Sequence, residues 1–190
     1  RSCSIDNAID NAKVIIPGKT LTDVNSLLSS EEDVRLGFDD KNAIFIIEDT
    51  KIITRLLEGD FIDYKKLLPR EYNSKIKLKT RDLLNSIERA SLLSQAEKNN
   101  LIKLSIRDNS MAITSNTDKG NVYEEVSLEL EGEYLDIAFN SRYFLEGLKN
   151  IDSEEIFIEF TTNVNPCIIK PADEVKYTYL LLPVRISSNI

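Results

Sequence analysis

The sequence predicts an α+β protein built from antiparallel sheets that helices cover on one side. Two observations predict this class. A pattern of a short apolar run, a helix start and apolar residues at helical spacing occurs three times, beginning at Val14, Lys75 and Leu135. Strand-like runs also outnumber helices. The period of about 60 residues indicates a repeated β-α-β-β-β unit.

Each copy of the unit supplies its elements in the same order. The first strand and the helix of each copy are expected within residues 14–28, 75–87 and 135–148. Polar linkers followed by period-2 alternation predict half-buried strands at 34–38 and 156–160. Further strand-like runs lie at 43–47, 52–57, 102–106, 111–114, 122–130, 166–170 and 176–182.

Two of the three helices have candidate capping residues. Thr80 precedes the second helical run, and Asn140 and Ser141 precede the third. Their side-chain oxygens can accept hydrogen bonds from the N–H groups of the first helical turn. We therefore expect Thr80, and either Asn140 or Ser141, to be N-caps.

A basic residue stands at the start of each helix, at Lys19, Arg81 and Arg142. The helix dipole disfavours cations there, so three at equivalent positions indicate a function rather than mere solvation. The net charge of −8 predicts repulsion of nucleic acid unless the charges are segregated. Acidic residues cluster elsewhere, at 31–33, 39–40, 124–125, 129–133 and 154–155. An acidic outer surface with basic helices would accommodate a phosphate-bearing partner.

Length and composition narrow the remaining possibilities. A chain of 190 residues can hold one large domain or one and a half smaller ones. It begins with Arg1, and we expect it to be a fragment of a longer protein. With 42% hydrophobic residues and no apolar run long enough to span a bilayer, no membrane role is predicted. Cys3 and Cys167, far apart, fit a reducing compartment with buried or incidental thiols.

Motifs that carry chemistry are missing from the sequence. The chain has no histidine, which removes the commonest general base and metal ligand. It also has no glycine-rich phosphate loop and no CxxC or HExxH pattern. The acid pairs at 31–32 and 154–155 occupy equivalent places in two copies and fit solvated turns. We therefore predict no catalytic residues, no metal and no cofactor.

The segment at 178–186 is unusually apolar for the end of a chain. Its large apolar residues and proline are predicted to be tucked into a core or to line a groove for another protein's side chains. In an extended strand Leu181 alternates with Leu180 and Leu182, so Leu181 is expected to face the opposite side.

Several segments, in order along the whole chain, carry a resemblance to a known family. They lie at 14–19, 54–69, 88–94, 139–145 and 179–186; the run from Arg55 to Tyr64 and the Pro-Val-Arg ending are the most specific. On these residues the chain resembles the C-terminal half of the bacterial DNA polymerase III beta subunit, the beta sliding clamp.

The resemblance implies a DNA-clamp fold of three domains, each made of two β-α-β-β-β halves. Two such chains close head to tail into a ring, with helices lining the hole and sheets outside. Residues 1–65 would be the second half of the middle domain, and residues 66–190 the complete C-terminal domain. A homodimeric ring around double-stranded DNA tethers the polymerase and has no chemistry of its own, although such clamps are often catalogued with the polymerase they serve.

The resemblance also implies three sets of site residues. Lys19, Arg81, Arg142 and Lys149 would face DNA. Leu92 and Leu93 would form the dimer interface, with ordinary core packing as the alternative. A groove would bind short peptides of the polymerase, the clamp loader and repair polymerases, and its matching positions are Ile62, Lys66, Leu67, Leu180, Leu182, Pro183, Val184, Arg185 and Ile186. The implied location is the bacterial cytoplasm, associated with the nucleoid.

Two departures and two alternatives accompany this interpretation. Ile62 stands where the family commonly has proline, and residues 187–190 run past its usual end. An enzyme on an α+β fold is one alternative, and the missing histidine and loop motifs count against it. The other is a repeat-built, peptide-binding adaptor that does not encircle DNA, for which the recurrent cations would be irrelevant.

Overall fold

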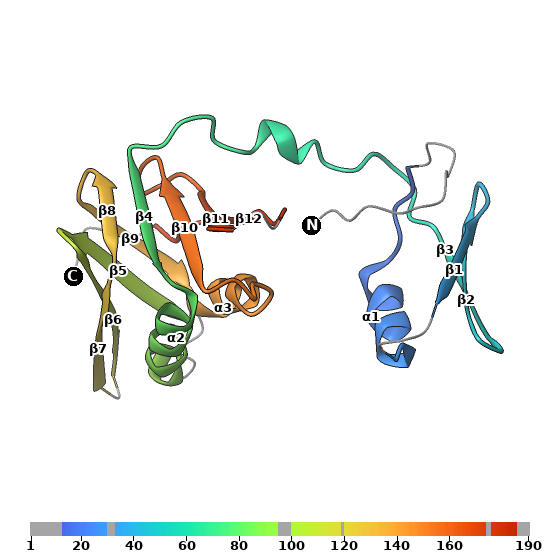
Figure 1. The fold of residues 1–190 in the computed structure, drawn as a ribbon, viewed down its shortest axis with the longest axis horizontal. Helices are drawn as coiled ribbons and strands as arrows, with labels where there is room; N and C mark the ends of the chain where they lie inside the picture. The colour runs from blue at the N-terminus through green and yellow to red at the C-terminus, as the bar shows by residue number, and fades with distance from the viewer. Residues whose placement is uncertain (1–12, 30–32, 95–99, 119, 174–175, 186–190) are drawn as a thin grey trace. The chain divides into compact units, whose positions relative to one another are not determined.

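The structure, a computed structural model, describes residues 13–185 apart from 30–32, 95–99, 119 and 174–175 (Figure 1). Two compact units divide between Asp63 and Tyr64. Both consist of antiparallel sheets and helices, so the predicted α+β class is confirmed.

The N-terminal unit contains one helix and one three-stranded sheet. Its elements are α1 (Gly18–Leu27), β1 (Val34–Phe38), β2 (Asn42–Ile47) and β3 (Thr50–Arg55), with sheet order β1-β2-β3. Alternation along β2 turns Ala43, Phe45 and Ile47 toward Val24 of α1, and these four residues form its small core.

Strand β1 does not have the half-buried alternation that its sequence predicts. All five of its residues are exposed, including Val34, Leu36 and Phe38. The core around Val24 draws on β2 and includes no residue of β1 among those described. The expected burial of β1 is therefore wrong, because nothing described in this unit covers its apolar side chains.

The C-terminal unit holds two sheets and two helices. One sheet has the order β12-β11-β10-β4-β8 and the other β7-β6-β5-β9. After a short 3₁₀ turn at Tyr64–Lys66, the elements are β4 (Ser74–Lys79), α2 (Thr80–Ser94), β5 (Leu101–Arg107), β6 (Ser110–Thr117), β7 (Gly120–Ser127), β8 (Glu129–Gly132), β9 (Leu135–Asn140), α3 (Ser141–Leu148), β10 (Glu155–Phe160), β11 (Cys167–Pro171) and β12 (Tyr179–Leu181).

Its two β-α-β-β-β halves exchange their first strands. Strand β4 opens the first half but pairs with β10 of the second, and β9 opens the second half but pairs with β5 of the first. Side chains from both halves, such as Leu83, Ile106 and Phe144, meet in one continuous core. Neither half can therefore complete its sheet without the other.

The strand predicted at 14–16 opens the first copy and is not formed. Among the described residues, only Ile15 of this segment takes part in a backbone bond, accepting from the Leu57 N–H at 2.9 Å. The equivalent bond in the C-terminal unit runs from Val184 N–H to Ala138 O at 2.8 Å, but there β9 also pairs with β5. The described N-terminal unit offers no such second sheet, and one bond does not make a strand.

The single strand predicted at 122–130 is also wrong. The chain leaves the first sheet after β7, passes through buried Leu128 and joins the other sheet as β8. The Leu128 N–H donates to Asn109 O at this crossing. Alternation continues through the crossing, so the sequence pattern contains no sign of the change of sheet.

One of the helix caps predicted from the sequence, at the start of α3, is confirmed. The Asn140 side chain accepts from the Arg142 N–H at 3.0 Å, which confirms Asn140 as the cap of α3. Thr80 is the first residue of α2, and its hydroxyl donates to Ser153 O at 2.6 Å.

Cys167 is fully buried, and that burial raises the pKa of its thiol, as expected for an inert cysteine. Cys3 lies outside the described residues.

Helix α3 is fastened to β12 and the segment before it. The Tyr177 hydroxyl donates to Gly147 O at 3.0 Å and the Tyr179 hydroxyl to Tyr143 O at 2.9 Å. The two tyrosine rings stack with centroids 6.5 Å apart. A β-carbon on Gly147 would come within 2.5 Å of Tyr179, so only glycine allows this close approach.

Gly147→Ala should therefore destabilise the C-terminal unit by about 1–3 kcal/mol, because the added methyl must displace the Tyr179 ring. Urea unfolding followed by tyrosine fluorescence isolates this unit, since all seven tyrosines occur at or after Tyr64. Asn85→Ala, at an exposed position of α2, is the control and should leave the midpoint nearly unchanged. Equal midpoints for both variants would contradict the packing described.

Candidate functional sites

The cations predicted to face DNA lie at equivalent places on the three helices. Lys19, Arg81 and Arg142 are each the second residue of their helix, and all are exposed. Lys149 follows the last turn of α3. Arg142 and Lys149 line one hollow of about 480 Å³, whereas Arg81 is not among its lining residues. Lys19 belongs to the N-terminal unit.

Two of these cations have carboxylate partners on the helices. Arg142 Nε lies 3.2 Å from Glu146 Oε1, one turn along α3. Lys149 Nζ lies 2.9 Å from Glu88 Oε1 of α2. Lys19 and Arg81 form no ion pair with any described residue. The first pair is visible in the sequence as a spacing of four residues. The second needs the packing of α2 against α3 and was not predicted.

Charges of both signs also share the sheets. Lys77 Nζ lies 2.7 Å from Glu155 Oε2, and Lys170 Nζ lies 2.7 Å from Glu159 Oε2, both across neighbouring strands. Within the described residues, this sheet therefore carries cations as well as acids. Such exposed pairs contribute little to stability.

An apolar groove of about 690 Å³ lies on the C-terminal unit beside β12. The structure brings two predicted groove residues, Leu67 and Leu180, together in its lining. The other lining residues were not predicted from the sequence; they are Tyr64, Leu68, Lys170, Pro171, Asp173, Lys176, Tyr177 and Thr178. Alternation with Leu180 could have identified Thr178, because both lie on the same side of an extended segment.

The other residues predicted for the groove are not among those that line it. Lys66 and the segment from Leu182 to Arg185 do not line this groove. Leu181 is buried, on the opposite side from Leu180, as its alternation predicts. The chain then turns away from the groove, because the Val184 N–H bonds to Ala138 of β9. Ile62 belongs to the N-terminal unit, and Ile186 lies outside the described residues.

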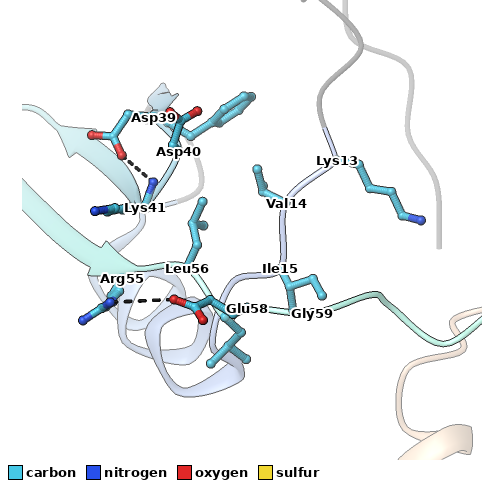
Figure 2. A pocket seen from close by; sticks show the side chains of 12 residues that line it. Lys13, Val14, Ile15, Asp39, Asp40, Lys41, Arg55, Leu56, Glu58 and Gly59 are labelled. Atoms are coloured by element: carbon cyan, nitrogen blue, oxygen red, sulfur yellow. Dashed lines mark hydrogen bonds and ion pairs between the residues drawn. The ribbon is translucent and has the colours of Figure 1, made fainter.

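A second hollow, of about 460 Å³, lies on the N-terminal unit (Figure 2). Val14, Ile15 and Leu56 form part of its wall. At its rim the Asp39 carboxylate accepts hydrogen bonds from the Lys41 and Asn42 N–H groups at 2.8 and 2.7 Å. These two bonds lower the pKa of Asp39, so the carboxylate stabilises its own turn.

Phe38, also in this wall, has a repeat counterpart in the C-terminal unit. The sequence repeat aligns Phe38 with Phe160, which is 1% exposed, whereas Phe38 is 36% exposed. Phe160 is buried in the core to which both halves contribute. The hollow in Figure 2 therefore has the character of uncovered core surface rather than a built ligand site.

The two leucines predicted at the dimer interface differ in exposure. Leu92 is 72% exposed, so ordinary core packing does not describe it. Leu93 is half-buried, and its Cδ1 lies near Gly120 at the start of β7. Strand β7 is an edge of its sheet. An exposed leucine beside an open strand edge is suited to association.

Helix α2 is joined to β7 by an ion pair. Arg89 Nε donates to Glu124 Oε1 at 2.8 Å, and a second bond links the other guanidinium nitrogen to Oε2. The bidentate hydrogen bonds lower the pKa of Glu124 and raise that of Arg89. This pair fixes the end of α2 that carries Leu92 against the strand edge.

The described residues contain no group of three His, Cys, Asp or Glu placed to hold a metal. No helix within the described ranges is long and apolar enough to cross a membrane.

Comparisons with known proteins agree on one family. The family model for the C-terminal domain of the DNA polymerase III beta subunit matches residues 65–185, and the model for its central domain matches residues 1–63. The beta sliding clamp of Staphylococcus epidermidis is 38% identical over 97% of this chain and 50% of its own length.

Solved structures give the same result. The beta chain of DNA polymerase III from Streptococcus pneumoniae has a TM-score of 0.90 at 32% identity and covers 97% of this chain and 50% of its own. The DNA polymerase sliding clamp from Bacillus subtilis has a TM-score of 0.86 at 33% identity, with 92% and 47% covered. The fold is therefore that of the sliding clamps.

On the match of both domain models, the chain belongs to the DNA polymerase III beta subunit family. It spans about half the length of the curated relatives it matches.

Glu124→Gln should lower the stability of the C-terminal unit near pH 7 by about 0.5 kcal/mol, because it breaks the bridge to Arg89. The pKa of Glu124 is lowered on folding, so its contribution is present above the ordinary pKa of 4.5 and is lost as the pH falls through the lowered pKa. The difference between wild type and variant should therefore be present at pH 7 and should close at an acidic pH below the lowered pKa of Glu124.

Tyrosine-monitored unfolding at both pH values checks this expectation. Glu131→Gln, on the other sheet, removes the same charge and serves as the control. A stability difference that persists unchanged in acid would mean that the carboxylate of Glu124 is not the source.

Proposed function

We propose that this protein is a sliding clamp, in which two chains form a ring around duplex DNA and tether the replicative polymerase. The observation that carries the proposal is the match, in order, to two domains of the DNA polymerase III beta subunit. A closed ring cannot leave DNA sideways, so an attached polymerase stays at high effective concentration. The role is mechanical, without catalytic residues, and belongs in the bacterial cytoplasm on the nucleoid.

Residues 1–65 then form the second half of the middle domain, and residues 66–190 the C-terminal domain. The exchange of first strands in the C-terminal unit supports this division, because a half cannot complete its sheets alone. Within the described part of the N-terminal unit, residues 14–16 have no second sheet to join, and Phe38 is 36% exposed. A preceding half-domain would supply both the missing strand partner and the missing cover.

The helices supply the contacts to DNA in this proposal. Lys19, Arg81, Arg142 and Lys149 are exposed on long flexible side chains, which can meet phosphates without reading bases. Loose contacts of this kind allow a ring to move along the duplex. Exposed Leu92 and the open edge of β7 are suited to closing the ring with a second chain.

The groove beside β12 supplies the contacts to partner proteins. Leu67 and Leu180 offer an apolar floor, with Lys170 and Lys176 in the lining to meet a polar or carboxylate group. Short extended peptides of the polymerase, the clamp loader and repair polymerases are the proposed occupants. The contributions of Ile62, Lys66, Leu182, Pro183, Val184, Arg185 and Ile186 to the groove remain predictions.

Reversing two of the helix cations tests the role in DNA binding. The double variant Lys19→Glu, Arg81→Glu should lose at least about tenfold in retention on nicked circular DNA after loading, because two phosphate contacts become repulsions. The measurement is gel filtration of loaded clamps on circular DNA, compared with the same DNA cut to a linear form.

Arg35→Glu, Lys51→Glu is the matched control, since it makes the same charge change on the N-terminal sheet. Normal retention of the helix variant would instead favour the peptide-binding adaptor that does not encircle DNA.

Leu180→Glu should weaken peptide binding about tenfold or more, because it places a charge on the apolar floor of the groove. Fluorescence anisotropy of a labelled peptide from the C-terminus of a replicative polymerase measures this affinity. Val164→Glu changes an exposed apolar residue outside the groove lining and should bind as wild type. Equal affinities for the two variants would exclude this groove as the peptide site.

A further inference from the structure

Acidic side chains on α2 and α3 contact two of the cations assigned to DNA. Glu146 contacts Arg142 at 3.2 Å, and Glu88 contacts Lys149 at 2.9 Å. The exposed fractions of Arg142 and Lys149 are 75% and 56%, and those of Glu146 and Glu88 are 53% and 44%. Both pairs therefore lie at the surface, where a third charged group can reach them.

These pairs are not needed to hold the two helices in place. Leu83 and Ile87 of α2 and Phe144 and Leu148 of α3 are almost completely buried in the shared core. Ion pairs at such exposed positions add little to stability. Their location beside the proposed DNA contacts calls for a different explanation.

Apart from Arg89, the exposed charges of these two helices are also equal in number. Arg89 is bonded to Glu124 of β7 and turns toward the sheet. The remaining exposed or half-exposed charges between the start of α2 and the end of α3 on these helices are three cations, Arg81, Arg142 and Lys149, and three acids, Asp82, Glu88 and Glu146. The exposed surface of α2 and α3 is therefore not predominantly basic.

We propose that Glu88 and Glu146 compete with DNA phosphates for Lys149 and Arg142 and thereby limit how tightly the ring holds the duplex. This inference rests on the proposed clamp function. A carboxylate and a phosphate accept hydrogen bonds from the same donors. A cation that turns to a phosphate leaves its carboxylate facing that phosphate, and the repulsion offsets part of the gain. Contacts then form and break easily as the ring moves.

The test uses the full natural protein that carries this chain, with the double variant Glu88→Gln, Glu146→Gln. Binding to a short linear duplex is measured over a series of salt concentrations. Each cation released to a phosphate makes the slope of log K against log salt more negative by about 0.9. For the two released cations, the loss of affinity between 50 and 200 mM salt should become about tenfold larger.

Diffusion of the loaded ring along DNA is the second readout, and it should become slower in the variant. Glu131→Gln, Glu133→Gln is the control, with the same change in net charge. In the strand register Glu131 lies beside Lys75, at the end of β4 away from α2. This control should keep the wild-type slope and diffusion. Thermal unfolding checks that both variants fold.

The possible outcomes distinguish a failure of the proposed competition from a failure of the proposed clamp function. Suppose that wild type is retained on circular DNA but the Glu88→Gln, Glu146→Gln variant matches the control in salt slope and diffusion. The proposed competition is then refuted, and the clamp function stands. If wild type is not retained on circular DNA at all, the clamp function fails and this inference fails with it.

Discussion

The exchange of first strands between half-domains is the constraint on which the rest of the structure depends. Because β4 pairs with β10 and β9 pairs with β5, each half completes the other's sheet. The apolar faces of both sheets and both helices then enclose a single core. This arrangement brings α2 and α3 into contact and gives their exposed residues a common surface. The exposed cations and acids of α2 and α3 lie on this surface.

The same half-domain also links the two proposed binding surfaces. Helix α3 carries Arg142, and β12 carries Leu180 of the groove. Two tyrosine hydroxyls and the close approach at Gly147 hold helix and strand together. The positions of Arg142 and Leu180, one residue from each proposed surface, are thus set by one packed element pair. Rigid support of this kind would suit the proposed clamp, whose binding sites must keep their positions while a ring is loaded.

Local patterns in the sequence predicted most of the fold. The predictions that failed concern features that depend on tertiary contacts. The recurrent unit, the cap at Asn140 and the inward position of Leu181 follow from spacing and alternation. The change of sheet after β7 and the exposure of β1 depend on which partner is present, which alternation does not encode. The same holds for the site: Glu88 meets Lys149 only because two helices pack.

The net charge of a protein of this kind is a poor guide to whether it can bind DNA. A net charge of −8 predicts repulsion of DNA, yet the surface of α2 and α3 carries three cations and three acids apart from Arg89, which is bonded to Glu124. A protein that binds DNA by affinity would need an excess of cations there. A ring holds DNA by topology, so it needs only enough attraction to offset repulsion while it slides. A charge-neutral helix surface is therefore compatible with a clamp, although it would be a weakness in a protein that had to find and grip DNA unaided.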